Sequence, residues 1–161
     1  MAARSWSLGV YVVFLVLLHL ILRLALGLGP GTPDLMTVAA LLAARRLTGA
    51  QAAAVGLVLG VLDDALTLVA FGSAAVALAL VCFLGARSRE LFEGDSLLFI
   101  AVYLFIGKWL RDGVVFLLSP ATRAADTVAE LFVAMPIAAA LAAAGGLVAM
   151  VVFRAATGER G

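Results

Sequence analysis

The sequence predicts an all-α integral membrane protein with six transmembrane helices. Of its 161 residues, 65% are hydrophobic and 13% charged, whereas a soluble domain is usually about half apolar with about 25% charged residues. The mean hydropathy is +1.20. Because a crossing takes about 20 residues and a connection a few more, this length holds roughly six crossings. We therefore expect one multi-pass domain over residues 1–161.

Apolar runs interrupted by charged residues, glycine or proline give the expected helix boundaries. The predicted helices cover residues 8–26, 34–46, 49–63, 66–84, 96–118 and 127–153. Pro30 and Pro33 separate the first two helices, and Ser96 is a suitable N-cap for the fifth. The first apolar run also resembles a removable signal peptide, but its length and the further apolar segments favour a retained helix.

The second and third predicted helices are short for complete crossings at about 1.5 Å per residue. A re-entrant hairpin is the alternative to two crossings. It would carry Arg45 and Arg46 into hydrocarbon, at about 2.5 to 3.5 kcal/mol each. We therefore expect the two helices to reach the inner membrane interface.

The arginines predict the orientation of the chain. With both termini cytoplasmic, the inner side carries Arg4, Arg45, Arg46, Arg87, Arg89, Arg154 and Arg160, whereas Arg23 and Arg123 lie towards the outer side. This bias follows the positive-inside rule and predicts cytoplasmic termini, with anionic lipids as partners of the inner face. The net charge of +1 gives no indication of a nucleic-acid partner.

Few residues suit catalysis or metal binding. The only histidine, His19, is expected to bond a neighbouring helix rather than to carry protons, and the only cysteine, Cys82, lies in an apolar run typical of a core. Asp63 and Asp64 are adjacent, so their side chains point in different directions and suit a cation poorly. We expect no metal site, no cofactor and no enzymatic activity.

Three ionisable residues inside the fifth predicted helix are the strongest site candidates. Lys108, Arg111 and Asp112 lie at membrane depth, where charged groups face protein or a wet cavity. Lys108 and Asp112 are four residues apart and share a helix face on which they can pair. They either hold helices together or line an outward-facing polar groove for a ligand or a partner's helix.

Small residues predict close helix packing. Gly56 and Gly60 form a Gly-x3-Gly pair in the third helix, and the sixth helix carries Ala138–Ala140 and Ala142–Gly146. Such surfaces let helix backbones approach closely. We expect this packing inside the bundle, with packing against another protein as the alternative.

The order of these features resembles the MreD family, the small multi-pass component of the bacterial rod-shape system, or elongasome. The resemblance rests on Pro33-Asp34-Leu35, on Gly56-x3-Gly60-x3-Asp64, on Gly72 eight residues later, and on the charged fifth helix with Asp112. It covers nearly the whole chain.

The resemblance implies a non-enzymatic membrane scaffold that binds MreC and so helps to control cell shape and lateral peptidoglycan synthesis. MreC would link it to the MreB filaments and to the RodA transglycosylase with its penicillin-binding transpeptidase. The family also resembles the substrate-binding subunit fold of energy-coupling-factor transporters, which implies an outer groove near Asp34, Asp64, Arg111 and Asp112 as the MreC contact.

The alternative is a substrate-binding subunit of a vitamin-type transporter. Such a pocket needs convergent aromatic and polar groups. The sequence offers two tryptophans and two tyrosines, of which Trp6 and Tyr11 lie at the inner end of the first helix. The scaffold is therefore the favoured prediction.

Overall fold

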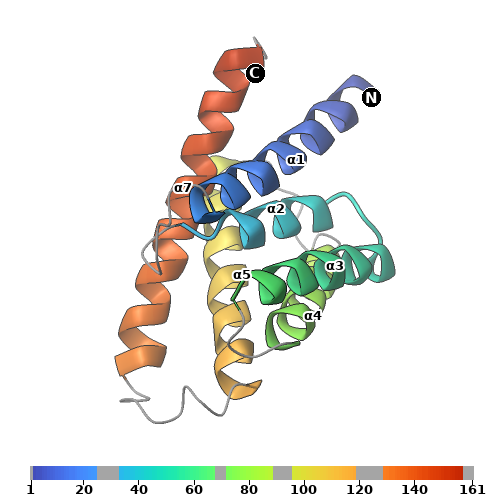
Figure 1. Ribbon diagram of the computed structural model, residues 1–161. Coiled ribbons are helices and arrows are strands. Elements are labelled where there is room, and N and C mark those ends of the chain that lie inside the picture. The colour runs from blue at the N-terminus through green and yellow to red at the C-terminus, as the bar shows by residue number, and fades with distance from the viewer. Residues whose placement is uncertain (1, 25–32, 68–71, 89–95, 119–128, 158–161) are drawn as a thin grey trace.

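The computed structural model describes residues 2–24, 33–67, 72–88, 96–118 and 129–157, and every element in these ranges is helical (Figure 1). The helices are α1 (Ala2–Leu24), α2 (Leu35–Ala44), α3 (Gly49–Thr67), α4 (Ser73–Ser88), α5 (Leu97–Leu118) and α7 (Met135–Thr157), with a π-helical segment, Glu130–Ala134, directly before α7. The expectation of an all-α fold is confirmed for these residues.

Polar side chains fix where several helices begin. The Asp34 carboxylate accepts hydrogen bonds from the Thr37 amide and hydroxyl, at 3.1 and 2.7 Å, and so caps α2. The Ser96 hydroxyl accepts from the Phe99 amide at 3.2 Å, which confirms it as the N-cap of α5. Pro136 is the second residue of α7 and directly follows the π-helical segment.

Two predicted boundaries near Asp63 and Asp64 are wrong. The third helix does not end at residue 63 but runs to Thr67, and the fourth begins at Ser73 rather than at residue 66. The adjacent aspartates suggested a break. They are instead 3% and 2% exposed, because neighbouring elements bind both carboxylates inside the bundle.

Several other boundaries also differ from the predicted ones. α1 begins at Ala2, α2 ends at Ala44, α4 continues to Ser88, and α7 continues to Thr157 after a π-helical start. Only the fifth helix agrees to within one residue, because Ser96 marks its start clearly.

Two hydrogen bonds show which parts of distant helices lie together. Tyr11, in the first half of α1, donates to the carbonyl of Gly146 in α7 at 2.8 Å and packs its ring on Phe153. Tyr103, near the start of α5, donates to the carbonyl of Leu41 near the end of α2 at 2.9 Å. The start of α1 and the end of α7 lie on the same side of the molecule (Figure 1).

We call the side that holds the end of α2, the end of α4 and the start of α5 the arginine end, because Arg45, Arg46 and Arg87 lie there. The opposite side holds the end of α1, the start of α2, the end of α3 and the second half of α5. We call it the charged end, since ion pairs described below join these four segments.

Small residues bring α3 and α4 into close contact. A Cβ atom on Gly56 would collide with the Leu78 carbonyl, and one on Gly60 with the backbone of Ala75. The Gly-x3-Gly pair therefore packs inside the bundle, as expected. It is covered by α4 and offers no surface to another protein.

The alanine-rich part of α7 also packs inward. Ala139 and Ala142 are fully buried, and a Cβ atom on Gly146 would press on Val38 of α2. Leu15, Leu41, Leu42 and Leu104 fill the space among α1, α2 and α5. Helix α2 is thereby enclosed, and nine of its ten residues are buried.

Two helical stretches in the described ranges are long and apolar enough to cross a membrane, Gly49–Leu66 and Leu131–Phe153. The apolar stretches Gly9–Arg23, Leu35–Ala44 and Ser73–Ser88 are shorter. Helix α5 has 22 residues but includes Lys108, Arg111 and Asp112. The structure thus identifies two candidate crossings by length and composition, not six.

Candidate functional site: a buried charged cluster

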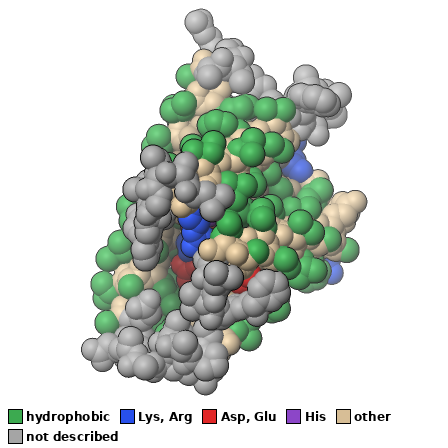
Figure 2. Space-filling model, in the orientation of Figure 1, with side chains coloured by type: hydrophobic (Ala, Val, Ile, Leu, Met, Phe, Trp, Pro, Cys, Tyr) green, Lys and Arg blue, Asp and Glu red, His purple; other side chains and the backbone are tan. Residues whose placement is uncertain are grey.

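Six ionisable side chains from four helices meet at the charged end. We call them the charged cluster: Arg23 of α1, Asp34 at the start of α2, Asp63 of α3, and Lys108, Arg111 and Asp112 of α5. Figure 2 shows basic and acidic side chains together near the middle of one face, with hydrophobic side chains around them. With three side chains of each sign, the cluster is neutral overall.

Arg111 is the centre of the charged cluster. Its Nη2 donates to Asp63 at 2.5 Å, and its Nη1 lies 3.1 Å from Asp112 and 3.5 Å from Asp34. A guanidinium group carries five N–H donors in a planar fork, so it can serve three carboxylates at once. Arg111 thereby joins α5 to both α2 and α3.

Lys108 completes the contact between α5 and α2. Its Nζ donates to both Asp112 oxygens, at 2.5 and 2.7 Å, and lies 3.2 Å from Asp34. The lysine is 6% exposed. The predicted pairing of Lys108 with Asp112 is therefore confirmed, and Asp34 is a second carboxylate partner.

Arg23 adds the first helix to the network. Its Nη1 donates to Asp63 at 2.6 Å, so the Asp63 carboxylate lies between Arg23 and Arg111. The side chain of Arg23 is 35% exposed, compared with 5% for Asp63. Among the members of the cluster, Arg23 is the one that reaches the surface of the molecule most.

Asp64 belongs to a different structure, the N-terminal cap of α4. Its carboxylate accepts hydrogen bonds from the amides of Gly72, Ala74 and Ala75 at 3.0, 3.1 and 2.9 Å. A carboxylate at this position is also favoured by the helix dipole. Gly72 takes a φ of 98°, a region that favours glycine, and so turns the chain into α4.

His19 lies one turn before Arg23 on α1 and is 5% exposed. Its Nε2 atom is buried and makes no hydrogen bond in the described part of the chain, and the Nε of Arg111 shares this property. The expected hydrogen bond from His19 to a neighbouring helix is therefore not seen at Nε2.

The structure brings together four of the five residues predicted for the polar groove, Asp34, Lys108, Arg111 and Asp112. The fifth, Asp64, is buried in its cap, and its neighbour Asp63 takes the place in the cluster. Sequence reasoning missed the roles of Asp63 and Arg23. The available signal was helical geometry, since adjacent residues on α3 point about 100° apart and face different helices.

The residues predicted for helix packing all have structural contacts or conformations that explain them. Leu35 is 3% exposed, and a Cβ atom on Gly145 would press on Pro33. Gly56 and Gly60 meet the backbone of α4, and Gly72 has a positive φ. These residues therefore determine helix contacts and a turn inside the bundle.

Chemically, the charged cluster is a set of ion pairs sheltered from solvent. Removing one partner from a buried pair leaves a charge without compensation and costs about 3 to 5 kcal/mol. In the described residues no group of three histidine, cysteine or acidic side chains is arranged to hold a metal ion. The arrangement is suited to holding four helices in one relative position.

Comparison of the chain with protein-family models, curated proteins and solved structures finds no match.

Proposed function

We propose that this chain is a non-enzymatic membrane scaffold of the MreD kind, which binds the bitopic protein MreC in the bacterial cytoplasmic membrane. Through MreC it acts on the RodA transglycosylase with its penicillin-binding transpeptidase and on the MreB filaments, and so on cell shape and lateral peptidoglycan synthesis. One observation carries the proposal: the motif residues lie at helix contacts, caps and turns inside the bundle, and two of them, Asp34 and Asp112, belong to a neutral, internally paired cluster.

A multi-pass topology with six crossings is part of this proposal. Support comes from the positions of the helix ends, which put the arginine end and the charged end on opposite sides of the molecule. The charges of α5 pair with each other and with Asp34 and Asp63, which lowers the cost of placing this helix in lipid. With the arginine end inward, both termini are cytoplasmic.

We assign the partner's transmembrane helix to the outer face of α1. Val10, Val13, Leu17 and Ile21 form an apolar stripe there and are between 45% and 58% exposed. Their spacing of three or four residues places them on one helix face. The stripe ends next to Arg23, which reaches the surface from the charged cluster.

The membrane-proximal segment of MreC is then placed over the charged end. Asp34, Arg111 and Asp112 have side chains that are 15%, 12% and 14% exposed, so a partner can reach only their edges. Asp64 is no longer part of this contact, because its carboxylate is buried against α4. The contact therefore depends on Arg23 and on the rim of the cluster.

Photocrosslinking in living cells tests this assignment. Benzoylphenylalanine at Leu17 of α1 is expected to crosslink to MreC, and the same residue at Val58 of α3, which is 67% exposed, is the matched control. A crosslink at Val58 and none at Leu17 would show that MreC binds α3 rather than the outer face of α1. The two benzoylphenylalanine variants must first be shown to accumulate equally in the membrane fraction.

Co-purification tests the scaffold itself. A tagged chain extracted in mild detergent from its own cells is expected to bring MreC with it. The scaffold proposal fails if the chain carries a bound vitamin and no MreC, which is the result expected of a transporter subunit.

A further inference from the structure

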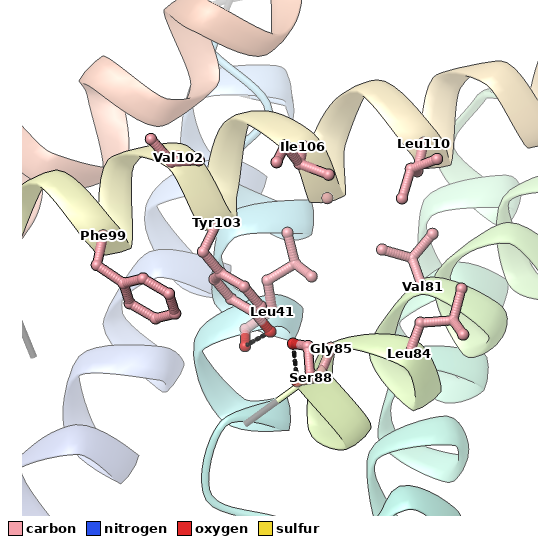
Figure 3. A pocket seen from close by; sticks show the side chains of 11 residues that line it. Leu41, Val81, Leu84, Gly85, Ser88, Phe99, Val102, Tyr103, Ile106 and Leu110 are labelled. Carbon is pink, nitrogen blue, oxygen red and sulfur yellow. Dashed lines mark hydrogen bonds between the residues drawn. The ribbon is translucent and has the colours of Figure 1, made fainter. Parts of the chain in front are cut away.

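An apolar pocket of about 410 Å³ opens between α4 and α5 at the arginine end (Figure 3). Val81 and Leu84 of α4 line one wall, and Val102, Ile106 and Leu110 of α5 line the other. Figure 3 shows the two rows of side chains facing each other across the space. The pocket extends along α5 from Phe99 to Leu110, and none of the six residues of the charged cluster lines it.

The polar groups that border the pocket are bound within the protein. The Tyr103 hydroxyl donates to the Leu41 carbonyl at 2.9 Å, and the Ser88 hydroxyl donates to the Gly85 carbonyl at 2.9 Å (Figure 3). The pocket wall therefore offers mainly hydrocarbon contact. It suits an apolar chain better than a ring that needs several hydrogen bonds.

A positive charge lies beside this apolar wall. The Arg45 guanidinium is 5.5 Å from the ring centre of Phe99 and 5.9 Å from that of Tyr103, and both rings line the pocket. Stacking on aromatic rings holds a guanidinium while its N–H donors remain in its plane, where phosphate oxygens can be bound. Exposed Arg87, next to Ser88 on α4, adds a second positive charge at this end.

We propose that the pocket binds one acyl chain of an anionic phospholipid, whose phosphate group pairs with Arg45. The apolar wall would contact the acyl chain, and the positive charge of Arg45 would favour a negatively charged headgroup. A helix is about 10 to 12 Å across with its side chains, so a pocket of this volume cannot enclose one. The inference rests on the membrane location in the proposed function but not on MreC binding.

Native mass spectrometry of the purified chain in detergent tests the proposal. The probes are phosphatidylglycerol and phosphatidylcholine with the same acyl chains. We expect one phosphatidylglycerol molecule to remain bound in preference to phosphatidylcholine. R45Q is expected to weaken retention of phosphatidylglycerol about fivefold, to the level of phosphatidylcholine, because one basic residue is lost at the lipid phosphate.

Two matched controls separate a specific site from a general attraction. R46Q removes the neighbouring, exposed arginine and is expected to leave the preference in place. I106W fills the pocket and is expected to reduce binding of both lipids, whereas L98W, on the same helix but outside the pocket lining, is expected to bind as the unchanged protein does.

Other outcomes would overturn the proposal. Equal loss of lipid in R45Q and R46Q would indicate a diffuse surface charge, and binding that is unaffected by I106W would place the lipid elsewhere. A dimer that is lost in I106W would assign the groove to a second copy of the chain. Because the experiment contains no MreC, a negative result would refute the lipid site without testing the scaffold proposal. Absence of the protein from the membrane fraction would refute both the lipid site and the scaffold.

Discussion

Arg111 on α5 and Asp63 on α3 form an ion pair whose two side chains are 12% and 5% exposed. The residues are 48 positions apart in the sequence, and the same carboxylate also binds Arg23 of α1. One carboxylate thus determines how three helices meet at the charged end. This arrangement gives the first of four predictions about stability.

Asp63→Asn is expected to lower the free energy of unfolding by about 3 to 5 kcal/mol, because Arg23 and Arg111 lose a shared buried carboxylate. Adding Arg111→Gln restores the charge balance, since Arg23, Asp34, Lys108 and Asp112 remain. The double variant is therefore expected to be more stable than the sum of the two single changes predicts. Thermal unfolding in detergent measures the coupling, and strictly additive effects would contradict the network.

Asp64→Ala is expected to loosen the start of α4. The change removes the acceptor of three amide hydrogens and costs about 1 to 3 kcal/mol. Asp64→Asn keeps one acceptor oxygen, so its stability is expected to lie between that of the unchanged protein and that of Asp64→Ala. Amide hydrogen exchange at Ala74 and Ala75 is the measurement, and unchanged protection in the alanine variant would argue against the cap.

Gly60→Ala is expected to destabilise the α3–α4 contact, as measured by thermal unfolding. Its Cβ would meet the backbone of Ala74 and Ala75, which cannot move aside as a flexible side chain can, and overpacking of this kind costs about 1 to 3 kcal/mol. Gly113→Ala is the matched control, because a Cβ atom there meets nothing within 4 Å. In the interior of α5 this control is expected to be neutral or to stabilise by about 0.5 to 1 kcal/mol.

Gly72→Ala tests backbone conformation rather than space. Nothing lies within 4 Å of a Cβ atom at this position, but the φ of 98° is unfavourable for alanine by about 1 to 2 kcal/mol. Gly72→Asn is expected to cost less, since asparagine tolerates positive φ better. Equal melting temperatures for the unchanged protein and for both variants would show that the turn adapts without strain.

Local patterns in the sequence predicted the parts of the fold that depend on neighbouring residues. The i, i+4 spacing of Lys108 and Asp112 correctly predicted their pairing, and the Gly-x3-Gly spacing correctly predicted packing inside the bundle. Ser96 correctly marked the start of the fifth helix. Lys108 and Ser96 each have a partner within one helical turn, and closely spaced glycines in an apolar helix favour close helix packing.

Features that depend on distant segments were not predictable in this way. The adjacent residues Asp63 and Asp64 read as the end of a helix, because their partners, Arg111 and the amides of α4, are known only once the helices are packed. For the same reason the sequence pointed to Asp64 as a site residue when Asp63 occupies that place. The role of Arg23 likewise required the structure.

The distribution of charge over the cluster has a consequence for synthesis of the chain. Arg23, Asp34 and Asp63, from the first three helices, sum to one negative charge, whereas Lys108, Arg111 and Asp112 on α5 sum to one positive charge. An intermediate that lacks α5 therefore carries a net negative charge among its apolar helices. Synthesis of α5 is the step that neutralises it, so chains truncated before residue 97 are expected to be degraded faster than the full chain.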